Sequence, residues 1–284
     1  MNTGLKEVRN ILETAILSNY IAENNKSRQD LAFSVILIAE PELNKTRELL
    51  RFSKIPNISV QTDLTYIGMI NDVLPKITRN EIKTIIIPDL LKCVKKKRDT
   101  ANNFITILNA LIEEGVHRVS LKEIYDFKGA RANILTSITP AIFMDSRTSW
   151  AKMGFFSRIL PFSYSYTEKK TQQVFDAIRK YKIDTTPIEM EIPMYKKSIE
   201  IGQKFTKVAE EYAKILGESE KVIHQRGRRR KIVIEGSKGF RHTWQIMALL
   251  KSLALKRGDD RVRLKDVRVF KRLSRWINYD FNPM

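Results

Sequence analysis

Phe33-Ser34-Val35-Ile36-Leu37-Ile38 is followed by a polar loop and then by Lys45-Thr46-Arg47-Glu48-Leu49-Leu50. The first run is short, almost continuously apolar and β-branched, which predicts a strand buried on both faces. The second run reads as the start of a helix. A buried strand that leads through a short loop into a helix is typical of a parallel α/β sheet.

The same alternation continues along the chain. Further strands are predicted at 58–60, 84–87 and 133–138, and helices at 5–24, 67–74 and 100–114. Parallel strands need crossover connections, which are usually helices. The sequence therefore predicts a mostly parallel sheet with helices on both faces.

The character of the chain changes after Asp184-Thr185-Thr186-Pro187, and helical spacing dominates from there on. Helices are predicted at 199–216, 243–256 and 265–276. We therefore expect an α/β core over residues 1–185 and a mostly helical C-terminal lid domain over residues 186–284. The sequence shows no internal repeat and no low-complexity segment.

The chain is strongly basic. Its 51 Lys and Arg residues against 32 Asp and Glu residues give a formal charge of +19. Nucleic acid is the commonest partner of such an excess, an anionic membrane surface is the rival, and a merely soluble basic protein is the third alternative. No apolar run approaches the roughly 18 residues of a membrane span, and the N-terminus has no signal-peptide pattern. We expect a cytoplasmic, nucleic-acid-associated protein without a membrane partner.

The cysteine and histidine content argues against disulfides, thiolate metal clusters and histidine-based zinc sites. Cys93 is the single cysteine, so the chain forms no internal disulfide and no thiolate metal cluster. The three histidines, His117, His224 and His242, are scattered, which disfavours a zinc site. A reducing compartment agrees with this composition.

Lys45 and Thr46 stand where a phosphate-binding P-loop places them, at the helix start after the buried strand. In that motif a Lys reaches the β- and γ-phosphates of ATP and a following hydroxyl reaches Mg²⁺. The loop 39–44 lacks both glycines of the motif, and its two carboxylates, Glu40 and Glu42, disfavour phosphate. Asn44 is expected to replace the second glycine in the left-handed conformation. The alternative is an ordinary strand–loop–helix.

Asp89 follows the predicted strand 84–87 and lies 44 residues after Lys45. An acid at this place would hold Mg²⁺ through water, together with Thr46. The second acid that usually polarises the attacking water is replaced by Leu90. The alternative for Asp89 is a turn or helix-cap residue.

The order of these and later elements resembles the AAA+ superfamily of P-loop ATPases, in its helicase and helicase-loader branches, over roughly residues 5–280. The resemblance implies that Asn133 or Thr136 contacts the γ-phosphate or the attacking water, with the register left open. It also implies that Arg158, in the segment 154–161, reaches a neighbouring subunit's nucleotide, and that Arg241 begins the lid helix. The alternative for both arginines is a solvated surface charge.

Two basic clusters are candidate nucleic-acid contacts. The denser cluster is flanked by the strand-like runs 222–224 and 232–234, which favours a β-hairpin with a basic tip over a solvated loop. It consists of Arg226, Arg228, Arg229, Arg230 and Lys231. The second cluster, Lys95, Lys96 and Lys97, follows Asp89, and the family resemblance implies that such loops line the pore of a ring.

We therefore expect a DNA-associated AAA+-type ATPase, or a degenerate relative, that uses ATP and Mg²⁺. It would self-associate into a ring or filament and act with other replication proteins, in replication or mobile-element processes. The alternative is a catalytically inactive DNA-binding or assembly module of the same fold. A nuclease is disfavoured because the sequence has no clustered carboxylates for two-metal cleavage.

Overall fold

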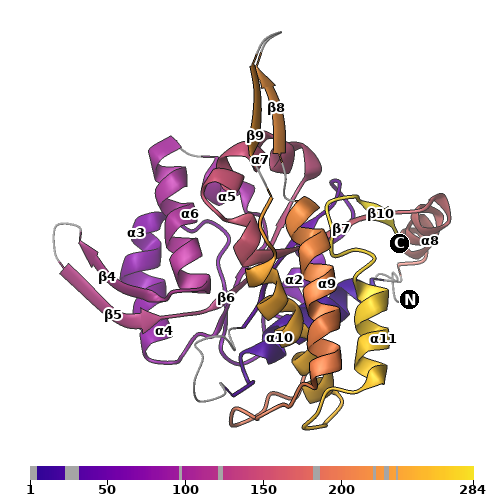
Figure 1. The fold of residues 1–284 in the computed structure, drawn as a ribbon. Helices are drawn as coiled ribbons and strands as arrows, with labels where there is room; N and C mark the ends of the chain where they lie inside the picture. The colour runs from indigo at the N-terminus through magenta and orange to yellow at the C-terminus, as the bar shows by residue number, and fades with distance from the viewer. Residues whose placement is uncertain are drawn as a thin grey trace.

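A six-stranded parallel sheet organises the molecule (Figure 1). The computed structural model describes residues 5–22, 32–95, 98–120, 124–181, 186–219, 222–226, 230–234 and 236–284. The strand order is β10-β7-β1-β6-β3-β2. The bounds are β1 Ser34–Ile38, β2 Ile58–Val60, β3 Thr84–Ile87, β6 Asn133–Ile138, β7 Ile159–Ser165 and β10 Asn282–Pro283.

Strand β1 lies inside the sheet, as its apolar sequence predicts. All five of its residues are buried. It pairs in parallel with β6 on one edge, Val35 opposite Leu135, and with β7 on the other, Ile36 opposite Pro161. The predicted strands at 58–60, 84–87 and 133–138 are confirmed as β2, β3 and β6.

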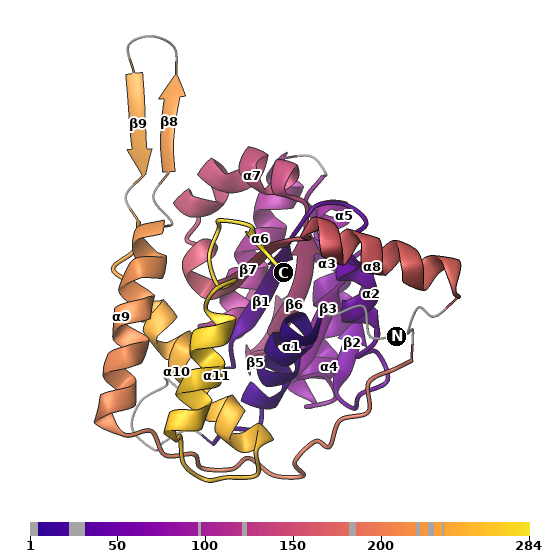
Figure 2. The ribbon, with the colours of Figure 1, turned by 90° about the vertical axis from the view of Figure 1, so that its right-hand side faces the viewer.

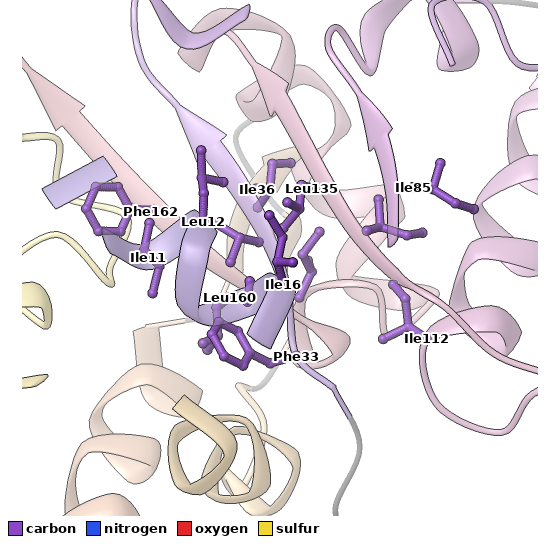
Figure 3. Close-up of a cluster of buried hydrophobic side chains, with 14 of the residues drawn as sticks. Ile11, Leu12, Ile16, Phe33, Ile36, Ile85, Ile112, Leu135, Leu160 and Phe162 are labelled. Atoms are coloured by element: carbon purple, nitrogen blue, oxygen red, sulfur yellow. The ribbon is translucent and has the colours of Figure 1, made fainter. Parts of the chain in front are cut away.

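Helices cover both faces of the sheet. On one face, α1 (Lys6–Ser18) packs on β1 and β6 and contacts α2 (Lys45–Leu50). Figure 3 shows Ile11, Leu12 and Ile16 of α1 directed toward the apolar side chains of the central strands. On the other face lie α3 (Tyr66–Gly68) and α6 (Arg98–Ile112). A π-helical turn, Met69–Val73, and α4 (Leu74–Thr78) continue α3, where the sequence predicts one helix at 67–74.

The C-terminal helices pack against the sheet domain on the side of α1 (Figure 2). They are α9 (Gln203–Ser219), α10 (Phe240–Lys256) and α11 (Leu264–Leu273). Helix α10 packs on α9, on α11 and on α1, and its buried Leu249 and Leu250 belong to the same hydrophobic cluster as β1. The two parts of the chain share one core, and their division into domains at residues 185 and 186 stays a prediction.

Two antiparallel hairpins leave this core. The predicted basic hairpin is present as β8 (Val222–Arg226) and β9 (Arg230–Ile234), with Arg226 opposite Arg230. It contacts α7 (Pro140–Lys152) and then projects beyond the rest of the molecule (Figures 1 and 2). The other hairpin, β4 (Val116–Ser120) and β5 (Ile124–Ala130), was not predicted because its polar and apolar residues do not alternate cleanly.

Strand β7 was also not predicted, because Pro161 argues against an inner strand. β10 pairs only with Tyr164 and Ser165. Among the described residues, Pro161 is therefore paired with β1 alone. Proline has no backbone N–H, but no described strand lies beside Pro161 on the side away from β1, so no hydrogen bond between strands is lost there. The short strand β10, the 3-10 turn Phe156–Arg158 and the helices α5 (Leu91–Val94), α7 and α8 (Glu168–Arg179) were not predicted either.

Asn133 joins four elements of the core. Its side-chain oxygen accepts from Asn19 at 2.9 Å and from Thr84 at 2.7 Å, and its amide donates to the carbonyls of Ala15 and Phe33 at 2.7 and 3.1 Å. Asn133 is buried. Because both polar atoms are fully bonded, this network connects α1, β3 and the segment before β1 to the amino end of β6.

Replacing Asn133 with Leu should destabilise the fold by about 2–4 kcal/mol, because it leaves several buried polar groups without partners. The free energy of unfolding from urea denaturation measures this. The control is Asn103→Ala on the exposed side of α6, which should change stability by no more than about 0.5 kcal/mol. Equal stabilities of the two variants would contradict the network's role.

Candidate functional site

The loop 39–44 connects the carboxyl end of β1 to α2 in a strained conformation. Asn44 has φ 61° and Glu42 has φ 66°, both in the left-handed region. The expectation for Asn44 is confirmed, and Glu42 adopts the same conformation at a cost of about 1–2 kcal/mol. Two tyrosines at the end of β7 hold the loop. The hydroxyl of Tyr164 donates to the carbonyl of Leu43 at 2.9 Å, and the hydroxyl of Tyr166, which follows β7, donates to the same carbonyl at 3.3 Å.

Lys45 points back into this loop. Its Nζ donates to the carbonyls of Ala39 and Glu40, both at 2.6 Å, and the side chain is buried. Burial lowers the pKa of Lys45 from its ordinary 10.5 to about 8, although the negative charges of Glu40 and Asp89 act in the opposite direction. The ammonium therefore occupies the space that the loop encloses, within electrostatic reach of Asp89.

Thr46 and Asp89 meet at the same edge of the sheet. The hydroxyl of Thr46 donates to the carbonyl of Pro88 at 3.4 Å, next to Asp89. One carboxylate oxygen of Asp89 accepts from the N–H of Leu91, two residues further on, at 3.1 Å, so Asp89 also has the turn role that the sequence left open. The N-cap of α5 is Leu90. The structure thus brings Lys45, Thr46 and Asp89 together at the carboxyl ends of β1 and β3.

A pocket of about 610 Å³ opens beside Lys45 and Thr46, and Asp89 is not among the residues that line it. We call it the carboxyl-edge pocket; its lining includes Glu42, Asn44, Lys45, Thr46 and Arg47. The hydroxyl of Thr46 and the carboxylate of Asp89 are the oxygen ligands that Mg²⁺ prefers. The donor chemistry of this edge therefore fits a nucleotide with its metal, with Glu40 and Glu42 as unfavourable charges.

Strand β6 lies between β1 and β3, and its polar residues have other roles than the resemblance implies. Asn133 lies at the amino end of the strand, the opposite end from Lys45, and belongs to the buried network described above. Thr136 is fully buried, and its hydroxyl donates to the carbonyl of Ile87 at 2.8 Å. Neither side chain is directed to the carboxyl-edge pocket, so the expected contact with a γ-phosphate is not formed by these two positions.

Other residues near the carboxyl end of β6 were missed by the sequence analysis. Ser137 donates to the carbonyl of Pro88 at 2.6 Å and so fixes the turn that carries Asp89. Thr139 follows the strand at the cap position of α7, where its side chain makes no capping bond. Leu90 stands where the motif has its second acid, and its apolar side chain is fully buried.

Arg158 and Arg241 lie together, away from Lys45. Arg158 precedes β7 at the amino edge of the sheet, and it forms ion pairs with Glu113 at 2.7 Å and Glu114 at 2.9 Å. Arg241 begins α10 and pairs with Glu113 at 2.5 Å. Because the intervening strands are five to seven residues long, about 16–23 Å separate the two edges. Arg241 therefore lies at the opposite edge of the sheet from Lys45 of its own chain.

The candidate nucleic-acid contacts are only partly described. Arg226 is the last residue of β8, and Arg230 and Lys231 are the first two residues of β9, at the end of the projecting hairpin. Lys95 is exposed after α5. Arg228, Arg229, Lys96 and Lys97 lie outside the described residues.

Titration of Lys45 should show a midpoint near pH 8, measured from the chemical shift of its ε-carbon. Glu40→Gln should lower the midpoint further, and by more than Asp89→Asn, because the Glu40 charge acts more strongly on Lys45. Since the folded pKa lies below the ordinary 10.5, Lys45's contribution to the free energy of unfolding should increase as pH rises from about 8 to 10.5. Glu210→Gln on α9 is the control and should leave the midpoint unchanged; an ordinary midpoint would contradict the burial of Lys45.

Two further properties concern the described part of the chain. It contains no helix with the length and apolar character that crossing a bilayer requires. Nor does it contain a group of three or more His, Cys, Asp and Glu side chains that could hold a metal ion. A Mg²⁺ ion at Thr46 and Asp89 would thus depend on phosphate oxygens and water for its other ligands.

No protein-family model matches the sequence, and no curated protein matches it either.

Proposed function

We propose that this protein is a nucleic-acid-associated nucleotide-binding protein of the AAA+ P-loop type. The observation that carries the proposal is the meeting of Lys45, Thr46 and Asp89 at the carboxyl edge of β1 and β3. Ligands of parallel α/β sheets bind at this edge. The interior position of β1 and the left-handed Asn44 add support, because both are needed for a loop that wraps a phosphate.

In the proposed complex each residue has a defined task. Lys45 leaves the carbonyls of Ala39 and Glu40 and neutralises the terminal phosphates of ATP. Thr46 and Asp89 would hold Mg²⁺, which would supply charge neutralisation on the phosphates. Thr136 and Ser137 keep Asp89 in place through the carbonyls of Ile87 and Pro88. Hydrolysis is expected to be slow, because Leu90 cannot polarise water.

A second candidate is a module of the same fold that binds DNA or assembles without ATP turnover. The bonds of Lys45 to two loop carbonyls favour it, because the loop is closed on the ammonium. The ion pairs of Arg158 with Glu113 and Glu114 favour it as well, since a role in a neighbouring subunit's nucleotide site requires that these pairs break. Oligomer formation belongs to the first candidate and remains part of the proposal.

The Lys45→Ala variant tests the nucleotide site. ATP affinity in the presence of Mg²⁺ should fall about 10- to 100-fold, the equivalent of one charged contact of about 1.5–3 kcal/mol. ATP hydrolysis with and without DNA should exceed the rate of this variant. Lys214→Ala, an exposed residue of α9, is the matched control. Equal affinities and equal background rates in all three proteins would favour the inactive module.

The basic hairpin is tested by changing Arg228, Arg229 and Arg230 to Ala together. DNA affinity should weaken, and the slope of log K against log salt should become shallower by about 2–3, since each lost phosphate contact removes about 0.9. Fluorescence anisotropy with a labelled duplex at several salt concentrations measures both. The control replaces three exposed basic residues of α11, Lys265, Arg268 and Lys271. If the salt slope of the hairpin variant equals that of the unmodified protein, the hairpin does not contact DNA.

A further inference from the structure

A second polar pocket lies at the opposite edge of the sheet from Lys45. It has a volume of about 340 Å³ and is formed around the amino ends of β3 and β6. Its walls come from the end of α1, the residue before β3, the end of β5 and the segment around Lys196. We call it the amino-edge pocket. It shares no lining residue with the carboxyl-edge pocket.

The charged side chains of this pocket have one sign. Among the described residues that line it, the charged ones are Lys83, Lys128, Arg131 and Lys196, and no carboxylate is present. None of these four forms an ion pair with a described residue. The neighbouring arginines Arg158 and Arg241 behave differently, because Glu113 and Glu114 neutralise them.

Two of the lysines repel each other across the pocket. The Nζ of Lys83 lies 4.4 Å from the centre of the Tyr20 ring. The pKa of Lys83 is lowered, first by burial and then by the positive charge of Lys196. The described residues offer no acidic group that relieves this repulsion, whereas a bound anion would relieve it.

Arg131 is held at the pocket by a backbone carbonyl. Its Nη2 donates to the carbonyl of Glu114 at 3.1 Å, which fixes the guanidinium at the pocket. Its Nε has no hydrogen-bond partner among the described residues, but this atom is closed off beside Gly115 and is not open to the pocket. Arg131 therefore adds positive charge to the pocket wall.

We propose that the amino-edge pocket is a second phosphate-binding site, which takes a phosphate ester from a nucleic-acid strand or from a free nucleotide. Lys83, Lys128, Arg131 and Lys196 provide the positive charge, and no carboxylate among the described lining residues opposes it. The volume accommodates a phosphate with its sugar. The site does not depend on the proposed nucleotide site, because it uses other residues at the other edge of the sheet.

The test is the double variant Lys83→Gln, Lys196→Gln, made in the full chain and again in the Lys45→Ala background. Binding of a labelled single-stranded oligodeoxynucleotide is measured by anisotropy at several salt concentrations, and binding of inorganic pyrophosphate by calorimetry. The matched control is Lys265→Gln, Lys271→Gln on α11, which makes the same change in net charge. Lys83→Arg, Lys196→Arg keeps the charge and should bind as the unmodified protein does.

Either of two results would support the site. If a nucleic-acid strand is the source, oligonucleotide affinity falls at least about tenfold and the salt slope decreases by about 1–2. If a free nucleotide is the source, pyrophosphate binding is lost while oligonucleotide binding stays equal to that of the control. Affinities for both probes that match the α11 control would overturn the proposal. If the double variant also weakens binding in the Lys45→Ala background, the amino-edge pocket acts separately from the proposed nucleotide site.

Discussion

The burial of β1 on both faces and both edges is the constraint on which the rest of the structure depends. Its five residues are buried, and β6 and β7 take its backbone hydrogen bonds on either side. A strand in this position needs a covered face above and below, which α1 and the helices of the opposite face provide. Because all neighbours are parallel, the loops after β1 and β3 meet at one edge, and this brings Lys45 and Asp89 within electrostatic reach.

Buried polar side chains fix how the strands align around β1. At the amino end of β6, Asn133 satisfies groups from α1, β3 and the segment before β1. At the carboxyl end, Thr136 bonds to the carbonyl of Ile87, the last residue of β3, and Ser137 bonds to the carbonyl of Pro88 that follows it. A slip of β6 by one residue would leave these groups unpaired in the interior, so the network and the apolar core specify the same register. The same register fixes the turn that carries Asp89.

The large positive charge is divided among places with different electrostatic environments. At the carboxyl edge a single buried lysine is held by backbone carbonyls. At the amino edge, Arg158 and Arg241 are neutralised by Glu113 and Glu114, whereas Lys83 and Lys196 face each other without an acidic partner among the described residues. The projecting hairpin adds Arg226 and Arg230, opposite each other in the two strands. An anionic partner would therefore meet several separate basic surfaces rather than one uniform field.

Local sequence patterns were enough to predict the parallel α/β core, because short, mostly apolar and β-branched runs such as 33–38 and 84–87 alternate with helical spacing. They also placed Lys45, Thr46 and Asp89 directly after those runs. The basic hairpin was also readable, because strand-like runs flank its tip. Tertiary structure decided what local patterns do not contain. It directed Asn133 and Thr136 to neighbouring backbone, paired Arg158 and Arg241 with acids 44 or more residues away in sequence, and collected Lys83, Arg131 and Lys196 around one pocket. Such contacts join residues far apart in the chain, so only the register and packing of whole elements fix them.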